Sequence, residues 1–194
     1  TYTLDGAGAL AVDYKLDISD RMPEPLRVGL QTCVPNTLER IAYFGKGPQE
    51  NYSDRCDGAF LGLYRSTPEK FMHSYITPQE NRCDVRWLSL TASDGRGVQF
   101  VGAEPLSVSV WNCTQESLDK ARHSNEVEPL ADALTVNIDR TQTGVGGTDT
   151  WSLKARPSDQ YRLLEKHYAC RFTIIPCNGE AETIRNGRSL FRNQ

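Results

Sequence analysis

The chain has 194 residues, of which 38% are hydrophobic and 24% charged, so it is a globular protein large enough to bury a core. Its formal net charge of −3 argues against a nucleic-acid-binding protein, which usually has a basic face. No apolar run approaches the roughly 20 residues of a membrane-spanning helix. We therefore expect neither nucleic acid nor a membrane as a partner.

Apolar and polar residues alternate along most of the chain, as expected for strands that bury one face. The predicted strands are residues 9–18, 26–34, 38–45, 85–92, 97–103, 106–111, 134–139 and 167–175. The segment "SDGRG" joins two of them and is typical of a tight hairpin, because Asp-Gly suits positions with positive φ. The pattern predicts an all-β fold built from antiparallel sheet.

Two segments depart from this alternation. Residues 114–124, "TQESLDKARHS", place Leu118 three positions before Ala121 and start with Thr114 as an N-cap, which predicts one short helix. Residues 176–194 are polar and lack a clear period, which predicts a tail or linker after a domain of residues 1–175. The first residues, "TYTLD", lack a start methionine and indicate a cut inside a longer protein.

The cysteines and histidines form no recognisable metal or redox motif. The wide, irregular cysteine spacings favour free thiols packed as small hydrophobic residues, with one or two disulfides as the alternative. The histidines make no zinc-binding spacing, so no metal site is predicted. These residues are Cys33, Cys56, Cys83, Cys113, Cys170, Cys177, His73, His123 and His167.

A glycine-rich loop stands out near the C-terminal third of the chain. The segment "TGVGGTDTW" contains Gly144, Gly146, Gly147, Asp149 and Trp151. A nucleotide-binding loop needs a lysine, or a helix that begins on the glycines, and neither is present. Two interpretations of Trp151 remain: a cap on the core, which the local pattern favours, or a flat aromatic platform for a sugar ring.

The tetrapeptide "PQEN" occurs twice, ending at Asn51 and at Asn81. Its glutamates, Glu50 and Glu80, could supply the two carboxylates that glycoside hydrolysis needs. Alternatively, these glutamates and asparagines satisfy backbone N–H groups at turns. The sequence pattern alone favours the second interpretation, because it says nothing about the separation of the two carboxylates.

Five segments occur in an order that resembles a known family. They are "YFGKGPQENYSDR" (43–55), "LGLY" (61–64), "YITPQENRCDVRWLSLT" (75–91), "LDKARHSNE" (118–126) and "IDRTQTGVGGTDTW" (138–151). Together they resemble the C-terminal small-chain domain of glycoside hydrolase family 2 β-galactosidases, from about residue 26 to residue 173. The resemblance implies an antiparallel supersandwich of the galactose mutarotase-like type, whose first strands are missing here.

The resemblance also implies a function. The chain would be an accessory domain of a β-galactosidase, and the two catalytic glutamates would lie on a separate barrel domain of the same parent chain. Glu50, Asn51, Glu80 and Asn81 would then shape loops at one rim of the sandwich, with no catalytic role.

For Trp151, the resemblance implies a place in the active-site wall, against the leaving group of the β-galactoside substrate. The glycines and Asp149 would shape the loop that presents it. The family usually has Asp-Asp-Ser before this tryptophan, and Thr148 replaces the first aspartate here. This departure implies an altered preference for the leaving group.

The resemblance assigns no catalytic residue, cofactor or metal to this domain, and it leaves any Mg²⁺ or Na⁺ ion to the parent enzyme. It is compatible with a homo-oligomeric parent from the cytoplasm or periplasm of a bacterium. The alternative function is a free-standing carbohydrate-binding or mutarotase-like module. An epimerase of that type needs a histidine and a glutamate that converge in a cleft, and no motif places them together.

Overall fold

The structure is a computed structural model, and it describes residues 1–72, 80–147, 149, 152 and 154–192. His73, Thr148 and Trp151 therefore lie outside the described residues. The strands are β1 (Tyr2–Leu4), β2 (Leu10–Asp17), β3 (Arg27–Pro35), β4 (Arg40–Gly47), β5 (Phe60–Ser66), β6 (Arg82–Thr91), β7 (Arg96–Trp111), β8 (Ala133–Gln142) and β9 (His167–Asn178). The helices are α1 (Pro68–Phe71), α2 (Gln115–Lys120) and α3 (Glu180–Arg192), with 3₁₀ turns η1 (Ser124–Glu126) and η2 (Asp159–Tyr161).

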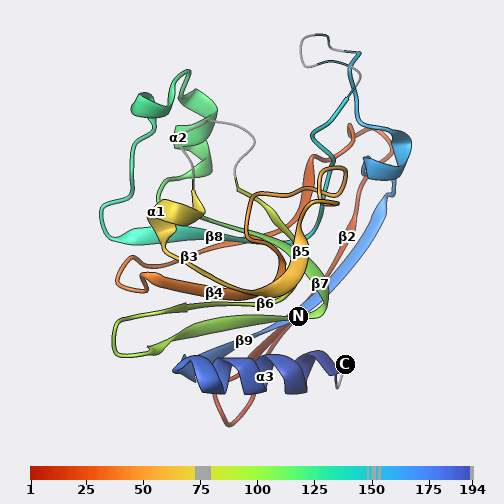
Figure 1. Cartoon of the computed structure of the whole chain (residues 1–194). Helices are drawn as coiled ribbons and strands as arrows, with labels where there is room; N and C mark the ends of the chain where they lie inside the picture. The colour runs from red at the N-terminus through yellow and green to blue at the C-terminus, as the bar shows by residue number, and fades with distance from the viewer. Residues whose placement is uncertain (73–79, 148, 150–151, 153, 193–194) are drawn as a thin grey trace.

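These strands form one antiparallel sheet in the order β1-β2-β9-β7-β6-β4-β5, from which β8 and then β3 branch off beside β7. The branch exists because the 16-residue β7 pairs with β9 over residues 96–102 and with β8 over residues 107–111. The sheet therefore divides and folds over, and Figure 1 shows β3 and β8 above β4, β6 and β9. The main core draws side chains from both branches, including Leu88, Val136 and Phe172. The predicted all-β antiparallel class is confirmed.

The strand β7 unites two strands that the alternation predicts separately. Pro105 lies between them and has no N–H to donate. It falls after the ladder with β9, which ends at Gly102, and before the ladder with β8, which begins at Ser107. The proline therefore sits where neither ladder requires a donor, and the strand continues through it.

The predicted helix is confirmed as α2, because the Ser117 N–H donates a hydrogen bond of 3.0 Å to the hydroxyl of Thr114. The expectation of a single short helix is wrong, since the described part also holds α1 and α3. The expectation of a polar tail from residue 176 is wrong too: β9 continues to Asn178, and α3 has 13 residues. No helix in the described ranges is long and apolar enough to span a membrane.

The helix α3 packs below β6, β7 and β9, at the bottom of Figure 1. The Gln99 amide donates a hydrogen bond of 2.8 Å to the Thr183 carbonyl oxygen, and Arg65 pairs with Glu180. Gly187 is buried against the indole of Trp87, so closely that a β-carbon at this position would overlap the ring. At this contact the helix docks through a residue without a side chain, which lets its backbone approach the indole ring.

We expect Gly187→Ala to detach α3 from the sheet, even though alanine raises intrinsic helix propensity by about 1 kcal/mol. Trp87 is 3% exposed and has little room to move away from the added methyl group. Hydrogen exchange of the backbone amides of residues 183–189 should accelerate. Ser189→Ala, at an exposed position of the same helix, is the control and should leave the exchange unchanged. Unchanged exchange in Gly187→Ala would contradict the packing described here.

All six cysteines are free thiols, which confirms the favoured alternative and excludes disulfides in this structure. Only Cys113, Cys170 and Cys177 are buried, so the expected burial holds for half of them. Burial raises the pKa of Cys113 to about 11, which keeps this thiol protonated and unreactive at neutral pH.

Candidate functional site

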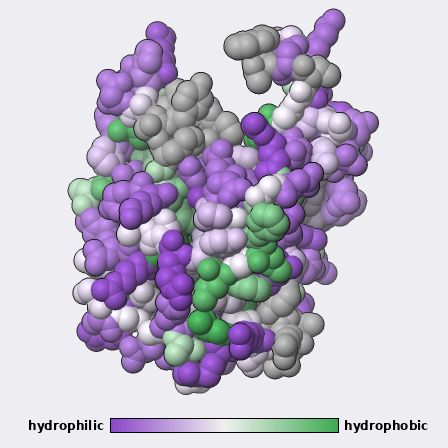
Figure 2. Space-filling view, viewed as in Figure 1, coloured by the Kyte–Doolittle hydropathy of each residue, from purple (hydrophilic) through white to green (hydrophobic). Residues whose placement is uncertain are grey.

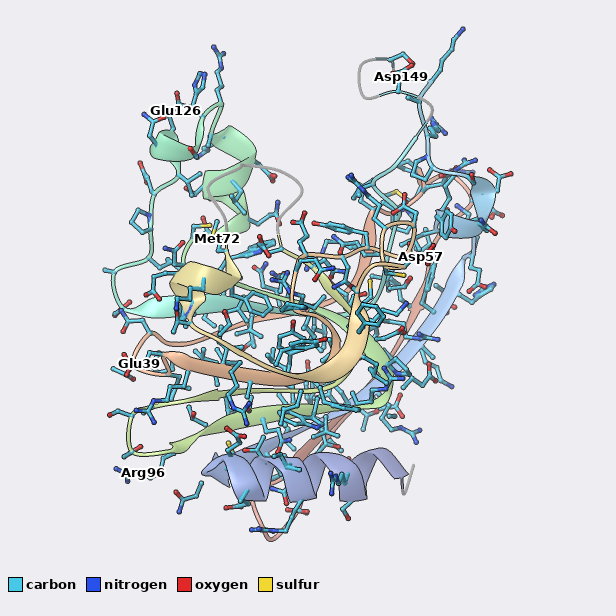
Figure 3. The ribbon with its side chains drawn as sticks, in the orientation of Figure 1. Glu39, Asp57, Met72, Arg96, Glu126 and Asp149 are labelled. Atoms are coloured by element: carbon cyan, nitrogen blue, oxygen red, sulfur yellow. The ribbon has the colours of Figure 1, made fainter. Side chains whose placement is uncertain are left out.

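The candidate site lies at the end of the molecule opposite α3, where several loops leave the sheet. The glycine loop follows β8 on the arm that carries Asp149 in Figure 3, and the loop that contains Asp57 lies near its base. Figure 2 shows that hydrophilic side chains dominate this upper end of the visible face. The loops therefore extend from the apolar core into a polar surface.

The glycine loop is tied to the body of the protein at its start. The Thr143 N–H donates a hydrogen bond of 2.9 Å to the carbonyl oxygen of Leu26. The Gly144 N–H donates one of 2.7 Å to the carbonyl oxygen of Tyr161. The loop is thus held between the segment before β3 and the turn η2.

The carboxylate of Asp54 anchors the next two residues of the loop. The Val145 N–H donates to Oδ1 at 3.1 Å, and the Gly146 N–H donates to Oδ2 at 2.6 Å. Two successive backbone N–H groups that converge on one carboxylate form an anion-binding nest. The sequence pattern does not single out Asp54, although it lies within the quoted "GPQENYSDR" segment.

The loop needs glycine because other groups occupy the space where β-carbons would lie. A β-carbon at Gly144 would be 2.6 Å from Cγ of Asp54, and one at Gly146 would be 2.8 Å from its Oδ2. A β-carbon at Gly147 would be 2.7 Å from the carbonyl oxygen of Ala155. Close approach of neighbouring atoms thus accounts for all three glycines.

Asp149 stabilises the far part of the loop. Its Oδ1 accepts a hydrogen bond of 2.7 Å from the Ser152 N–H, and its Oδ2 accepts one of 3.1 Å from the Ser152 hydroxyl. An aspartate that bonds the backbone a few residues ahead is a common turn-forming device. Trp151 itself lies outside the described residues, and its role in an active-site wall stays a prediction.

The last two residues of the first "PQEN" tetrapeptide, Glu50 and Asn51, pack against the last two of the second, Glu80 and Asn81. The Glu80 N–H donates a hydrogen bond of 2.6 Å to Oε2 of Glu50. The Asn51 N–H donates to the Asn81 carbonyl oxygen at 2.9 Å, and the Asn81 side-chain amide donates to the Asn51 carbonyl oxygen at 3.0 Å. The glutamate and asparagine of one tetrapeptide therefore pair with the glutamate and asparagine of the other.

The second glutamate of the repeat is held in a buried ion pair. Arg82 Nη1 lies 2.6 Å from Oε2 of Glu80, and their side chains are only 4% and 9% exposed. The same guanidinium donates to the Pro48 carbonyl oxygen at 3.0 Å and lies over the ring of Phe71, 4.5 Å from its centroid. Both glutamates thus bind backbone or arginine groups, an arrangement suited to holding loops rather than to acid and base catalysis.

Metal ligands do not gather in the described ranges, where no group of three or more His, Cys, Asp or Glu residues could hold an ion. His123 lies 3.2 Å from Glu126, and His167 lies 2.7 Å from Asp17, both on the surface. In the described part of the chain, neither histidine forms a hydrogen bond with Glu50 or Glu80.

A family model described as beta galactosidase small chain matches residues 1–174, which is most of the chain. The chain belongs to this family. The region that matches the small-chain family begins at residue 1, earlier than the expected residue 26, and includes β1 and β2. It ends within β9, so α3 lies beyond it.

Relatives of this small-chain domain include β-galactosidases from several bacteria. The protein of Priestia megaterium is 32% identical over 179 residues, which are 91% of this chain and 17% of that protein. The protein of Vibrio cholerae is 33% identical over 175 residues, which are 89% of this chain and 16% of that protein. The small-chain domain thus spans about one sixth of the length of the relatives it matches.

Proposed function

We propose that this chain is the accessory small-chain domain of a β-galactosidase that hydrolyses terminal non-reducing β-D-galactosides. The observation that carries the proposal is how much of each protein aligns. The alignments cover about 90% of this chain but only 16–17% of the length of the two relatives. The parent would use a retaining mechanism with two glutamates on a barrel domain outside this chain.

Within that parent, the chain would supply Trp151 to the wall of the active site. The anchoring of the loop before Trp151 supports this role, because Asp54, Tyr161 and Leu26 each accept hydrogen bonds from it. A flat aromatic side chain offers a large contact area for a sugar ring at small entropic cost. Thr148, in place of the usual aspartate, removes one negative charge beside this contact.

The experiment compares the purified 194-residue chain with its parent enzyme on a chromogenic β-galactoside. We expect hydrolysis by the parent and none by the chain, because the chain lacks the catalytic glutamates. In the parent, we expect Trp151→Ala to raise KM for lactose by about tenfold, since one aromatic contact contributes on the order of 1–2 kcal/mol. Hydrolysis by the isolated chain, or unchanged kinetics in Trp151→Ala, would contradict the proposal.

A further inference from the structure

We infer that Asp54 is the positioning residue that fixes the glycine loop in the whole enzyme and thereby sets how it discriminates between leaving groups. This inference rests on the proposed function, because it assumes that the loop presents Trp151 to the substrate. Asp54 lies 91 positions before Val145 in the sequence, so the contact joins two distant segments.

The carboxylate suits this task better than any other side chain of similar size. Its two oxygens accept one hydrogen bond each, from the N–H groups of Val145 and Gly146. An amide side chain has only one acceptor oxygen, and its NH₂ group would face the second backbone N–H. Asp54→Asn therefore keeps the volume of the side chain but replaces one attraction by a contact between two donors.

Asp54 is itself held firmly. The backbone N–H of Arg55 donates to the carbonyl oxygen of Tyr52 at 2.9 Å, which closes a turn around Asp54. The side-chain amide of Asn51 donates to the carbonyl oxygens of Lys46 and Gln49 at 3.2 and 2.9 Å. The pairing of Asn51 with Asn81 and these bonds thus fix the segment that carries Asp54, and Asp54 in turn fixes the glycine loop.

The contact between Gly146 and Asp54 can be tested with a double-mutant cycle. Among the residues that the structure describes, the atoms that a β-carbon at Gly146 would meet within 4 Å both belong to the Asp54 carboxylate. Gly146→Ala should therefore displace the carboxylate or the loop in the natural protein. Once Asp54→Ala has removed the carboxylate, the methyl group at position 146 has room.

The test uses the whole parent enzyme with two substrates that share galactose but differ in leaving group, p-nitrophenyl β-galactoside and lactose. We expect Asp54→Asn, Asp54→Ala and Gly146→Ala each to change the ratio of the two kcat/KM values by about 10- to 100-fold, because small displacements in an active site have effects of this size. Partial misfolding would lower both kcat/KM values equally and leave their ratio unchanged. In the double variant, Gly146→Ala should add no further change to Asp54→Ala.

Two controls complete the experiment. Asp57→Ala, at an exposed position of the same loop, should leave the ratio unchanged. Hydrogen exchange of the Val145 and Gly146 amides should accelerate in Asp54→Asn, which is a readout independent of activity. The inference would be overturned if Asp54→Asn left the ratio of the two kcat/KM values unchanged. It would also be overturned if the effects of Asp54→Ala and Gly146→Ala multiplied in the double variant.

The outcome for Trp151→Ala separates this inference from the proposed function. If that variant changes neither kcat/KM value, the proposed role of Trp151 fails and the inference on leaving-group discrimination fails with it. If it lowers both values equally, the proposed function stands and only the inference is overturned. If Trp151→Ala changes the ratio but the Asp54 and Gly146 variants do not, the proposed function stands and only the role of Asp54 is overturned.

Discussion

Replacing Glu80 with alanine is expected to lower the free energy of unfolding by about 3–5 kcal/mol, the range found when one partner of a buried ion pair is removed. Arg82 would keep its positive charge while only 4% of its side chain is exposed. The backbone carbonyl oxygens of Pro48 and Asn81 would remain as its hydrogen-bond partners. They carry no net charge, so the guanidinium would stay buried without an anion.

Urea unfolding of the chain, followed by circular dichroism, measures this loss. Glu80 has a positive φ of 48°, and alanine keeps the same backbone strain, so the change isolates the side chain. Glu80→Gln retains an acceptor for Arg82 and should lose less stability than Glu80→Ala. Glu116→Ala, at an exposed ion pair of α2, is the control and should cost less than about 1 kcal/mol. A similarly small loss for Glu80→Ala would show that the pair does not hold the repeat together.

The strands could be predicted where one face is buried and the other exposed. In β9, the buried Tyr168, Cys170 and Phe172 alternate with exposed residues, and the sequence alternates in the same way. The alternation fails in β5, because the adjacent apolar residues Phe60 and Leu61 are both exposed, at 75% and 50%. The sequence pattern also fails to predict α3, whose buried positions among residues 180–189 are Thr183 and Gly187 and which docks against the distant Trp87.

The candidate site could be predicted in its parts but not in its connections. The glycine loop and the repeated "PQEN" are conspicuous in the sequence because their composition is unusual. Asp54 is not, because an aspartate in a turn-rich segment has many ordinary uses. Its role depends on two N–H groups more than 90 positions away, and only the folded sheet brings them together.

A second buried carboxylate should make the stability of the chain depend on pH. Asp139 lies on β8, is 2% exposed and is 2.8 Å from Nη2 of Arg27. Burial raises the pKa of Asp139 from 3.8 to about 6, although Arg27 acts in the opposite direction. Between these two values the folded chain binds more protons than the unfolded chain, so this carboxyl group stabilises the fold at low pH and loses that contribution as pH rises through 6.

The predicted result is a pH-dependent difference between the natural chain and Asp139→Asn, which cannot titrate at this position. The free energy of unfolding of the natural chain, minus that of the variant, should fall by about 2.5 kcal/mol between pH 4 and pH 7, because each unit of pKa shift corresponds to about 1.4 kcal/mol and the unfolded group is already partly ionised at pH 4. Taking the difference cancels the contributions of the other carboxyl groups, because both proteins contain them.

Arg27→Met provides the opposite perturbation. Arg27 lies over the ring of Trp111, 5.5 Å from its centroid, and methionine fills part of this space without a charge. Asp139 would then be buried without a cation, its pKa would rise further, and the loss of stability would extend to higher pH. Urea unfolding of the three proteins at half-unit steps of pH from 4 to 8 tests both expectations. Parallel curves for the natural chain and Asp139→Asn would mean that Asp139 stays ionised throughout, held by Arg27 despite its burial.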